Sequence, residues 1–161
     1  MNQLKNKTTL SLILIFSIFA LIAAYFIQYI LGHKPCNLCL IERLPYISSI
    51  ILTLLSLILK KFEKIIFILL ALIFISATII SFYHFGIEQG FFQESLVCNS
   101  NNAINSLNKK DILKELQKIT ISCKDVSFTF LGLSLAAINT IISLALSVIT
   151  SKLFLKYEKN K

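Results

Sequence analysis

Two cysteines lie within HKPCNLCLIERLPY, which occupies residues 33–46 between two apolar stretches. Cys36 and Cys39 are separated by two residues, and Arg43 follows four positions after the second. Thiols at this spacing can bind a metal, attach a haem or form a reactive disulfide. A purely structural disulfide is disfavoured, because closing so short a loop constrains the unfolded chain very little.

The other chemistries can be weighed from the remaining residues. Covalent haem requires a histidine directly after the second cysteine, where Leu40 stands. Zinc could take all four cysteines, but 24 residues separate Cys98 from Cys123, and thiolate zinc sites favour reducing surroundings. His33 and His84 could clamp a haem b, which would leave the cysteines without a purpose. Redox chemistry is the leading interpretation.

The residues around the pair support this interpretation. Pro35 suits the first turn of a helix, whose positive end would favour the thiolate form of both cysteines. Arg43 lies one turn after Cys39 and could face its sulfur, or could pair with lipid headgroups or the adjacent Glu42. Pro45 cannot donate within a helix, so the sequence predicts either a kink or a helix start near Arg43.

Long apolar segments must position these thiols. Of the 161 residues, 56% are hydrophobic and 15% charged, whereas soluble proteins have about 45–50% and about 25%. Three of the four segments are long enough to cross a bilayer core of roughly 30 Å, and the second, which is short, is expected to start earlier, near Cys36 or Cys39. The first is too long for a signal peptide. We predict a single domain, an all-α integral membrane four-helix bundle, with spans at about residues 8–31, 40–59, 65–87 and 126–151.

The distribution of lysine predicts the orientation. Both termini and the turn at residues 60–64 would share one side, which carries nine lysines: Lys5, Lys7, Lys60, Lys61, Lys64, Lys152, Lys156, Lys159 and Lys161. Lysines near helix ends mark the cytoplasmic side, so both termini are expected there. This pattern explains the net charge of +8 without nucleic-acid binding. All four cysteines then lie in the exported loops, residues 32–43 and 88–125, where conditions are oxidising.

The longer exported loop has features of its own. Residues 111–119 have the pattern of a short amphipathic helix lying on the membrane, with Asp111 as its cap. The Asn- and Ser-rich sequence around Cys98 is typical of a mobile segment or of a simple solvated linker.

These motifs together resemble the disulfide bond formation protein B family. The resemblance rests on QYILGHKPCNLCLIERLPY, YHFGIEQGFF, the cysteines Cys98 and Cys123, and FLGLSLAAIN, and it covers most of the chain. It implies a multi-pass protein of the bacterial inner membrane. Such a protein reoxidises a periplasmic thioredoxin-like dithiol oxidase and passes the electrons to a respiratory quinone, ubiquinone or alternatively menaquinone.

The resemblance also implies a relay of electrons. The reduced partner would attack a disulfide between Cys98 and Cys123, forming a mixed disulfide with Cys98. Electrons would pass to Cys36 and Cys39, and Cys39 would deliver them to quinone. The family pattern assigns three residues to the neighbourhood of the quinone: Arg43, Gln28 and His84.

Energetics favours an acceptor of this kind. A partner near about −120 mV cannot be reoxidised by a pool near about −200 mV, whereas a quinone gives a downhill step. The rival hypothesis is a membrane scaffold whose exported loops are held by inert disulfides.

Overall fold

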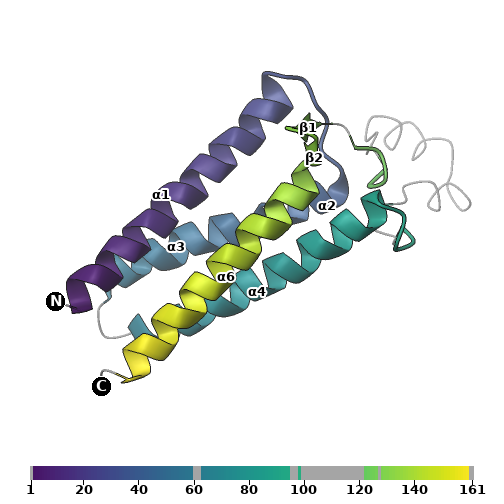
Figure 1. Cartoon of the computed structure of the whole chain (residues 1–161). Helices are drawn as coiled ribbons and strands as arrows, with labels where there is room; N and C mark the ends of the chain where they lie inside the picture. Colours follow the sequence, from purple (N-terminus) through teal and green to yellow (C-terminus); the bar gives the residue numbers. More distant parts are fainter. Residues whose placement is uncertain (1, 60–62, 95–97, 99–121, 127, 160–161) are drawn as a thin grey trace, which may run out of the picture.

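The computed structural model describes residues 2–59, 63–94, 98, 122–126 and 128–159 (Figure 1). Within these ranges the chain is mainly helical, with one two-stranded antiparallel sheet. In chain order the elements are α1 (Asn2–Tyr29), α2 (Asn37–Ile41), α3 (Leu44–Ile58), α4 (Glu63–Glu88), β1 (Thr129–Phe130), β2 (Leu133–Ser134) and α6 (Leu135–Lys159).

Four segments of the described chain are helical, long and apolar enough to cross a membrane: Lys7–Tyr29, Asn37–Ser56, Lys64–Glu88 and Leu135–Leu155. In the bundle α6 packs along α4, and α3 packs against both α1 and α4. The N-terminal end of α1 and the C-terminal end of α6 lie at the same end of the bundle (Figure 1). The prediction of an all-α four-helix membrane bundle is confirmed.

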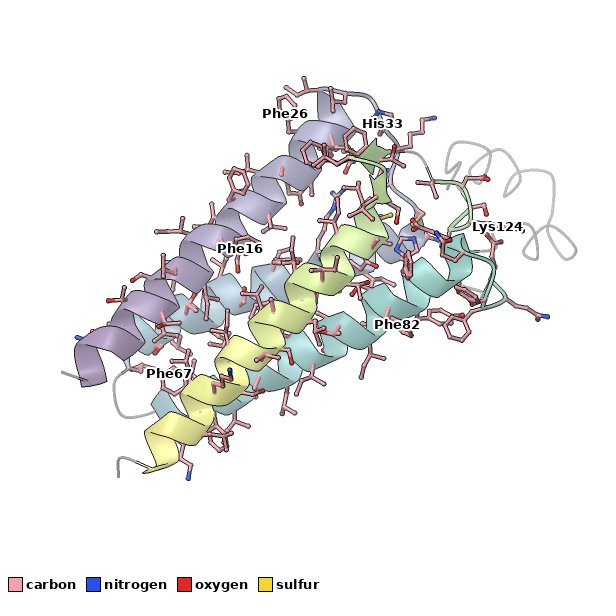
Figure 2. All side chains as sticks on the ribbon, in the orientation of Figure 1. Phe16, Phe26, His33, Phe67, Phe82 and Lys124 are labelled. Atoms are coloured by element: carbon pink, nitrogen blue, oxygen red, sulfur yellow. A yellow bond between two sulfur atoms is a disulfide. The ribbon has the colours of Figure 1, made fainter. Side chains whose placement is uncertain are left out.

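The helices bury a core and leave other apolar side chains outside. Phe67, Leu70 and Phe74 of α4 are at most 1% exposed and pack with residues from the other three long helices. Ser17 and Ser49, both fully buried, join α1 to α3 through a 2.8 Å hydrogen bond between their hydroxyls. Such small polar contacts help to hold membrane helices together. Figure 2 shows Phe67 near the end where the termini lie and His33 near the opposite end.

The second span is interrupted close to the cysteines. It consists of α2 and α3, with Glu42 and Arg43 between them. Pro45 lies in the first turn of α3, where its missing N–H costs nothing. Of the two expected alternatives, a helix start near Arg43 is the one observed. Pro35 does not occupy the first turn of α2 as expected, because Cys36 is the N-cap and Asn37 the first helical residue.

The predicted start of the fourth span at residue 126 is wrong. α6 begins nine residues later, at Leu135, and a β-hairpin precedes it. Leu131 and Gly132 have φ values of 53° and 80°, which turn the chain between β1 and β2 and interrupt any helix. Apolar composition alone does not distinguish this hairpin from a membrane helix. The amphipathic helix expected at residues 111–119 lies outside the described residues.

Candidate active site

The structure brings the two cysteine pairs into one buried cluster, at the end of the bundle opposite the chain ends. Cys36, Cys98 and Cys123 are at most 5% exposed and share this cluster with Leu38 and Ile87, and Cys39 packs against it. Cys98 and Cys123 form a disulfide with their Cα atoms 5.4 Å apart. Cys36 and Cys39 are free thiols. An intact disulfide and a reduced dithiol therefore lie within the same small region.

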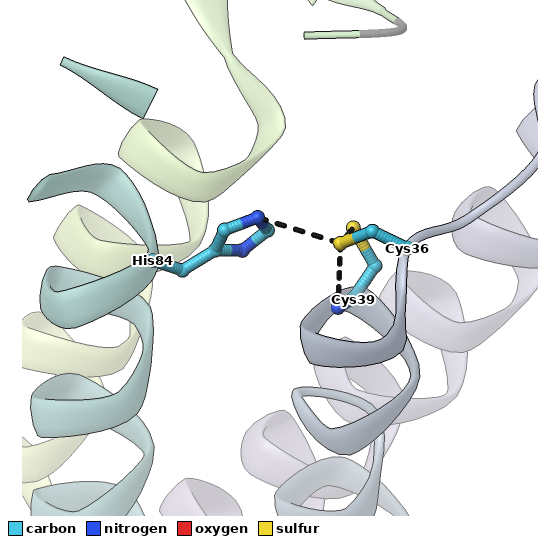
Figure 3. Close-up of side chains that lie close together, drawn as sticks. All are labelled: Cys36, Cys39 and His84. Carbon is cyan, nitrogen blue, oxygen red and sulfur yellow. Dashed lines mark hydrogen bonds between the residues drawn. The ribbon is translucent and has the colours of Figure 1, made fainter. Parts of the chain in front are cut away.

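The N-terminus of α2 determines the geometry of the dithiol. The Sγ atoms of Cys36 and Cys39 are 2.8 Å apart, and the backbone N–H of Cys39 donates to Cys36 Sγ at 3.2 Å (Figure 3). The cap position of Cys36 thus directs its sulfur at the unpaired N–H groups of the first turn. Hydrogen bonding from the Cys39 thiol, supported by His84, lowers the pKa of Cys36 to about 5, although burial acts to raise it. Cys36 is set up to be a thiolate.

His84 approaches this thiol from α4. Its Nε2 atom lies 3.5 Å from Cys36 Sγ, and its Nδ1 atom lies 2.8 Å from Oε1 of Glu42 (Figure 3 draws the contact with sulfur). The histidine is 2% exposed. Its Nε2 atom is also 3.9 Å from Oε1 of Glu88, one helical turn further along α4. The ring therefore connects a sulfur with two carboxylates in a site that excludes most solvent.

Glu42 is a site residue that the sequence did not reveal. Its second oxygen, Oε2, accepts from Nδ2 of Asn139 on α6 at 2.9 Å, and Oδ1 of the same amide accepts from the Tyr46 hydroxyl at 2.6 Å. The sequence suggested Glu42 only as a possible partner of the adjacent Arg43, and it gave Asn139 no role in this site. A signal was present, since Glu42 follows Cys39 by three positions and Asn139 is an amide within an apolar span.

Arg43 contacts α1, which was not among the partners that its spacing from Cys39 suggested. Its Nη1 atom donates to Oε1 of Gln28 on α1 at 2.7 Å, and its guanidinium lies 4.9 Å from the centre of the Tyr25 ring. Among the described contacts of Arg43, this pair with α1 stands in place of the two protein partners that the sequence suggested, the Cys39 sulfur and Glu42. Two of the residues assigned by resemblance to the quinone neighbourhood, Arg43 and Gln28, therefore touch each other.

A cavity of about 280 Å³ adjoins these side chains. Apolar residues of α1 and α6 form much of its wall, including Phe16, Ala20, Ala24 and Ile142. Its polar lining includes Gln28, Cys39, Arg43, Glu42, His84 and Glu88. The three residues assigned by resemblance to a quinone thus surround one cavity together with a thiol.

Glu88 is, after Glu42, the second carboxylate of this site that the sequence did not predict. It was expected in the exported loop, but it is the last residue of α4, and its side chain is 6% exposed. Its Oε2 atom is buried and has no hydrogen-bond partner among the described residues. Its spacing of four from His84 on one helix explains why the two side chains meet.

The Sγ atoms of Cys36 and Cys39 and a ring nitrogen of His84 lie within 4.8 Å of one another, a grouping that could suit a metal. Two thiolates on one tetrahedral zinc ion would stand about 3.7 Å apart, given Zn–S distances of about 2.3 Å. The observed separation of 2.8 Å does not fit that arrangement. The four-thiolate zinc alternative is also inconsistent with the disulfide between Cys98 and Cys123.

Four membrane-length helices around a dithiol and an adjacent disulfide define a membrane-embedded thiol–disulfide oxidoreductase. The family described as "Disulfide bond formation protein DsbB" matches residues 6–152, nearly the whole chain. This protein belongs to the DsbB family, and it is a multi-pass membrane oxidoreductase of the disulfide-forming kind.

One relative from a bacterium is similar along almost its entire length. The chain is 33% identical over 156 residues to "Uncharacterized protein RP370" of Rickettsia prowazekii (strain Madrid E), covering 94% of this chain and 90% of the relative. No solved structure matches the chain.

Proposed function

We propose that this protein reoxidises a periplasmic thioredoxin-like dithiol oxidase and passes the electrons to a respiratory quinone, thereby sustaining disulfide formation in exported proteins. The observation that carries this proposal is the placement of both cysteine pairs in one buried cluster beside an apolar cavity. A scaffold held by inert disulfides would gain nothing from a free dithiol packed against a disulfide.

The cavity suits a quinone headgroup. A flat ring with an isoprenoid tail needs apolar walls, which α1 and α6 supply, and its carbonyl oxygens need hydrogen-bond donors. The Arg43 guanidinium provides such donors, and Gln28 and Tyr25 hold it in place. His84, on α4, lines the same cavity. Both ubiquinone and menaquinone meet this description, with ubiquinone as our first choice.

The cysteines divide the exchange chemistry between them. A thiolate of the reduced partner attacks the Cys98–Cys123 disulfide, so that a mixed disulfide forms with Cys98 and Cys123 leaves as a thiolate. When Cys36 and Cys39 are joined as a disulfide, Cys123 attacks that bond from within the same cluster. The partner's second thiol then releases Cys98, whose thiolate attacks the disulfide that now joins Cys123 to the first pair. This step restores the Cys98–Cys123 bond, so that Cys36 and Cys39 hold the two electrons.

A bound quinone would accept two electrons and two protons, which would allow the Cys36–Cys39 disulfide to form again. Cys39 lines the cavity and is the residue that delivers the electrons. Arg43 stabilises the negative charge that develops in the cavity. The imidazole of His84, whose Nε2 atom faces Cys36, can hold the proton that accompanies the Cys36 thiolate. Two electrons leave the sulfurs, and two protons leave with them, one from the Cys39 thiol and one from the Cys36–His84 pair, so the reaction balances.

The proposed location is the bacterial inner membrane, with the cysteine end of the bundle facing the periplasm and both termini in the cytoplasm. The lysines near the opposite helix ends support this orientation. The bilayer also explains the choice of electron acceptor, because a quinone with a long apolar tail is dissolved there.

The deciding experiment mixes purified protein with a reduced thioredoxin-like dithiol oxidase and a short-chain quinone. One molecule of quinone should be reduced, as its loss of absorbance shows, for every two thiols that the partner loses. Cys39→Ser should abolish both signals, while Lys152→Gln, at the other end of the bundle, should leave them unchanged. Thiol loss without quinone reduction would contradict the proposed acceptor, and the absence of both would favour the scaffold.

A further inference from the structure

A chain of buried hydrogen bonds runs from α6 to the thiol of Cys36. It passes from the Tyr46 hydroxyl to the Asn139 amide, then to Glu42, His84 and the sulfur. We propose that Asn139 is a positioning residue for the dithiol: its amide fixes the Glu42 carboxylate, which in turn holds His84 against Cys36. The inference deepens the proposed function and rests on it.

The direction of each hydrogen bond follows from the groups involved. A phenol hydroxyl at 2.6 Å from Asn139 Oδ1 donates to that oxygen, which leaves the NH₂ group to face Oε2 of Glu42 at 2.9 Å. A carboxylate can only accept, so the amide in this orientation is its matching partner. Tyr46, which is 6% exposed, therefore determines which end of the amide meets the acid.

The orientation of Glu42 is then passed on to His84. With Oε2 engaged by Asn139, Oε1 is directed at Nδ1 of His84, 2.8 Å away. The imidazole donates its Nδ1 proton to Glu42, and Nε2 is left facing Cys36 Sγ at 3.5 Å. A proton on Nε2 balances the charge of a thiolate at Cys36. This is the arrangement of an activated thiol nucleophile, with a base oriented by a third group.

The backbone N–H of Glu42 donates to the Leu38 carbonyl at the C-cap of α2, whereas its side-chain oxygens bind groups on two other helices. It lies in the two-residue interruption between α2 and α3, where no continuous helix sets its direction. Its side chain is 10% exposed, so water offers little competition for its oxygens. Asn139 projects from the second turn of the long helix α6 and supplies a donor to this junction.

The electrostatic surroundings of Cys36 include several groups besides this chain. Those facing the thiol from α2, α4 and the α2–α3 junction are Cys39, His84, Glu42 and Glu88. Further charged residues on the same cavity wall are Lys34, Arg43 and Asp125. A change at Asn139 alters none of these charges, which makes it a clean probe of position.

The experiment measures the ionisation of Cys36 without quinone or partner. In a Cys39→Ser background with the second disulfide intact, Cys36 is the single thiol, and ultraviolet thiolate absorbance gives its titration midpoint. Asn139→Leu removes the donor to Glu42, and we expect the midpoint to rise by about one pH unit. Asn139→Gln keeps an amide, so the titration midpoint of Cys36 should rise less in this variant than in Asn139→Leu.

Thr140→Val is the matched control, because the Thr140 hydroxyl donates only to the Ala136 carbonyl of its own helix in the described contacts. The titration midpoint of Cys36 in the Thr140→Val variant should equal that of the Cys39→Ser background. A folded Asn139→Leu variant with an unchanged midpoint would overturn the inference. If that variant does not fold, Tyr46→Phe replaces it, since loss of the hydroxyl frees the amide to turn, and an unchanged midpoint there would count against the inference equally. Either result leaves the proposed oxidase activity to be judged by its own assay.

Discussion

The imidazole of His84 lies between an acid and a thiol, with Nδ1 2.8 Å from Glu42 Oε1 and Nε2 3.5 Å from Cys36 Sγ. The three side chains come from α4, the α2–α3 junction and the N-cap of α2. Glu42 and His84, which are 42 positions apart in the chain, thus form with Cys36 one hydrogen-bonded unit at the dithiol.

This unit predicts an unusual pH dependence of the Cys36 thiol. Because the pKa is lowered to about 5, the thiolate is present at neutral pH and is lost as the pH falls through that value. The Cys39→Ser background already lacks the hydrogen bond that lowers this pKa most. His84→Gln then removes the supporting contact, so the titration midpoint of Cys36 should rise above that of the background with His84 intact. Thiolate absorbance in the Cys39→Ser background measures this directly, and an unshifted midpoint would contradict the assigned role of His84.

The shared cluster predicts that cysteines from different pairs can join. In a Cys39→Ser, Cys98→Ser double variant only Cys36 and Cys123 remain, and both side chains are buried in that cluster. Mild oxidation should link them within one molecule, as seen by mass spectrometry of the digested protein without reduction. Replacing Cys36 with serine as well should remove the linked peptide. Two persistent free thiols would mean that the pairs do not exchange directly.

Arg43 should affect the quinone step more than the partner step. Arg43→Lys keeps the charge but loses the planar guanidinium that binds Gln28 and stacks near Tyr25. Loss of one charge-assisted hydrogen bond of about 1.5 kcal/mol corresponds to roughly a tenfold rise in the KM for a short-chain quinone. The rate of mixed-disulfide formation with the partner should not change. Equal effects on both steps would indicate a general disturbance of the fold.

The bundle core predicts a contrast between two phenylalanines of α4. Phe74 is fully buried and packs edge-on against Tyr46, whereas Phe82 is 56% exposed on the outside of the bundle. Phe74→Ala should lower the free energy of unfolding by about 3–5 kcal/mol, because it leaves a cavity. Phe82→Ala should cost less than about 1 kcal/mol. Reversible unfolding in mixed detergent micelles provides the measurement, and similar losses for both would place Phe82 in an interface.

The sequence predicted the parts of this protein that depend on composition and spacing. Membrane-length apolar stretches indicated the helices, and the two-residue spacing of Cys36 and Cys39 indicated a redox pair. It did not predict the hairpin before α6, because the apolar residues there also suit a helix, and only the positive φ values at Leu131 and Gly132 distinguish the two.

The polar network depends on contacts that spacing cannot reveal. Asn139 meets Glu42 across 97 positions of sequence, and Glu88 contacts His84 from the last position of α4, one residue beyond the predicted end of this span. Each of these residues had an ordinary interpretation when taken alone. They form one polar network only where three helices pack together, and the sequence pattern does not show that packing.

The interruption between α2 and α3 sends two adjacent side chains to opposite neighbours. Glu42 reaches α4 and α6, while Arg43 reaches α1. Inserting or deleting one residue between Cys39 and Pro45 would turn this register by about 100° and separate both side chains from their partners. The segment from Cys39 to Pro45 must therefore keep a fixed number of residues. Insertions and deletions in related proteins should fall in other parts of the chain.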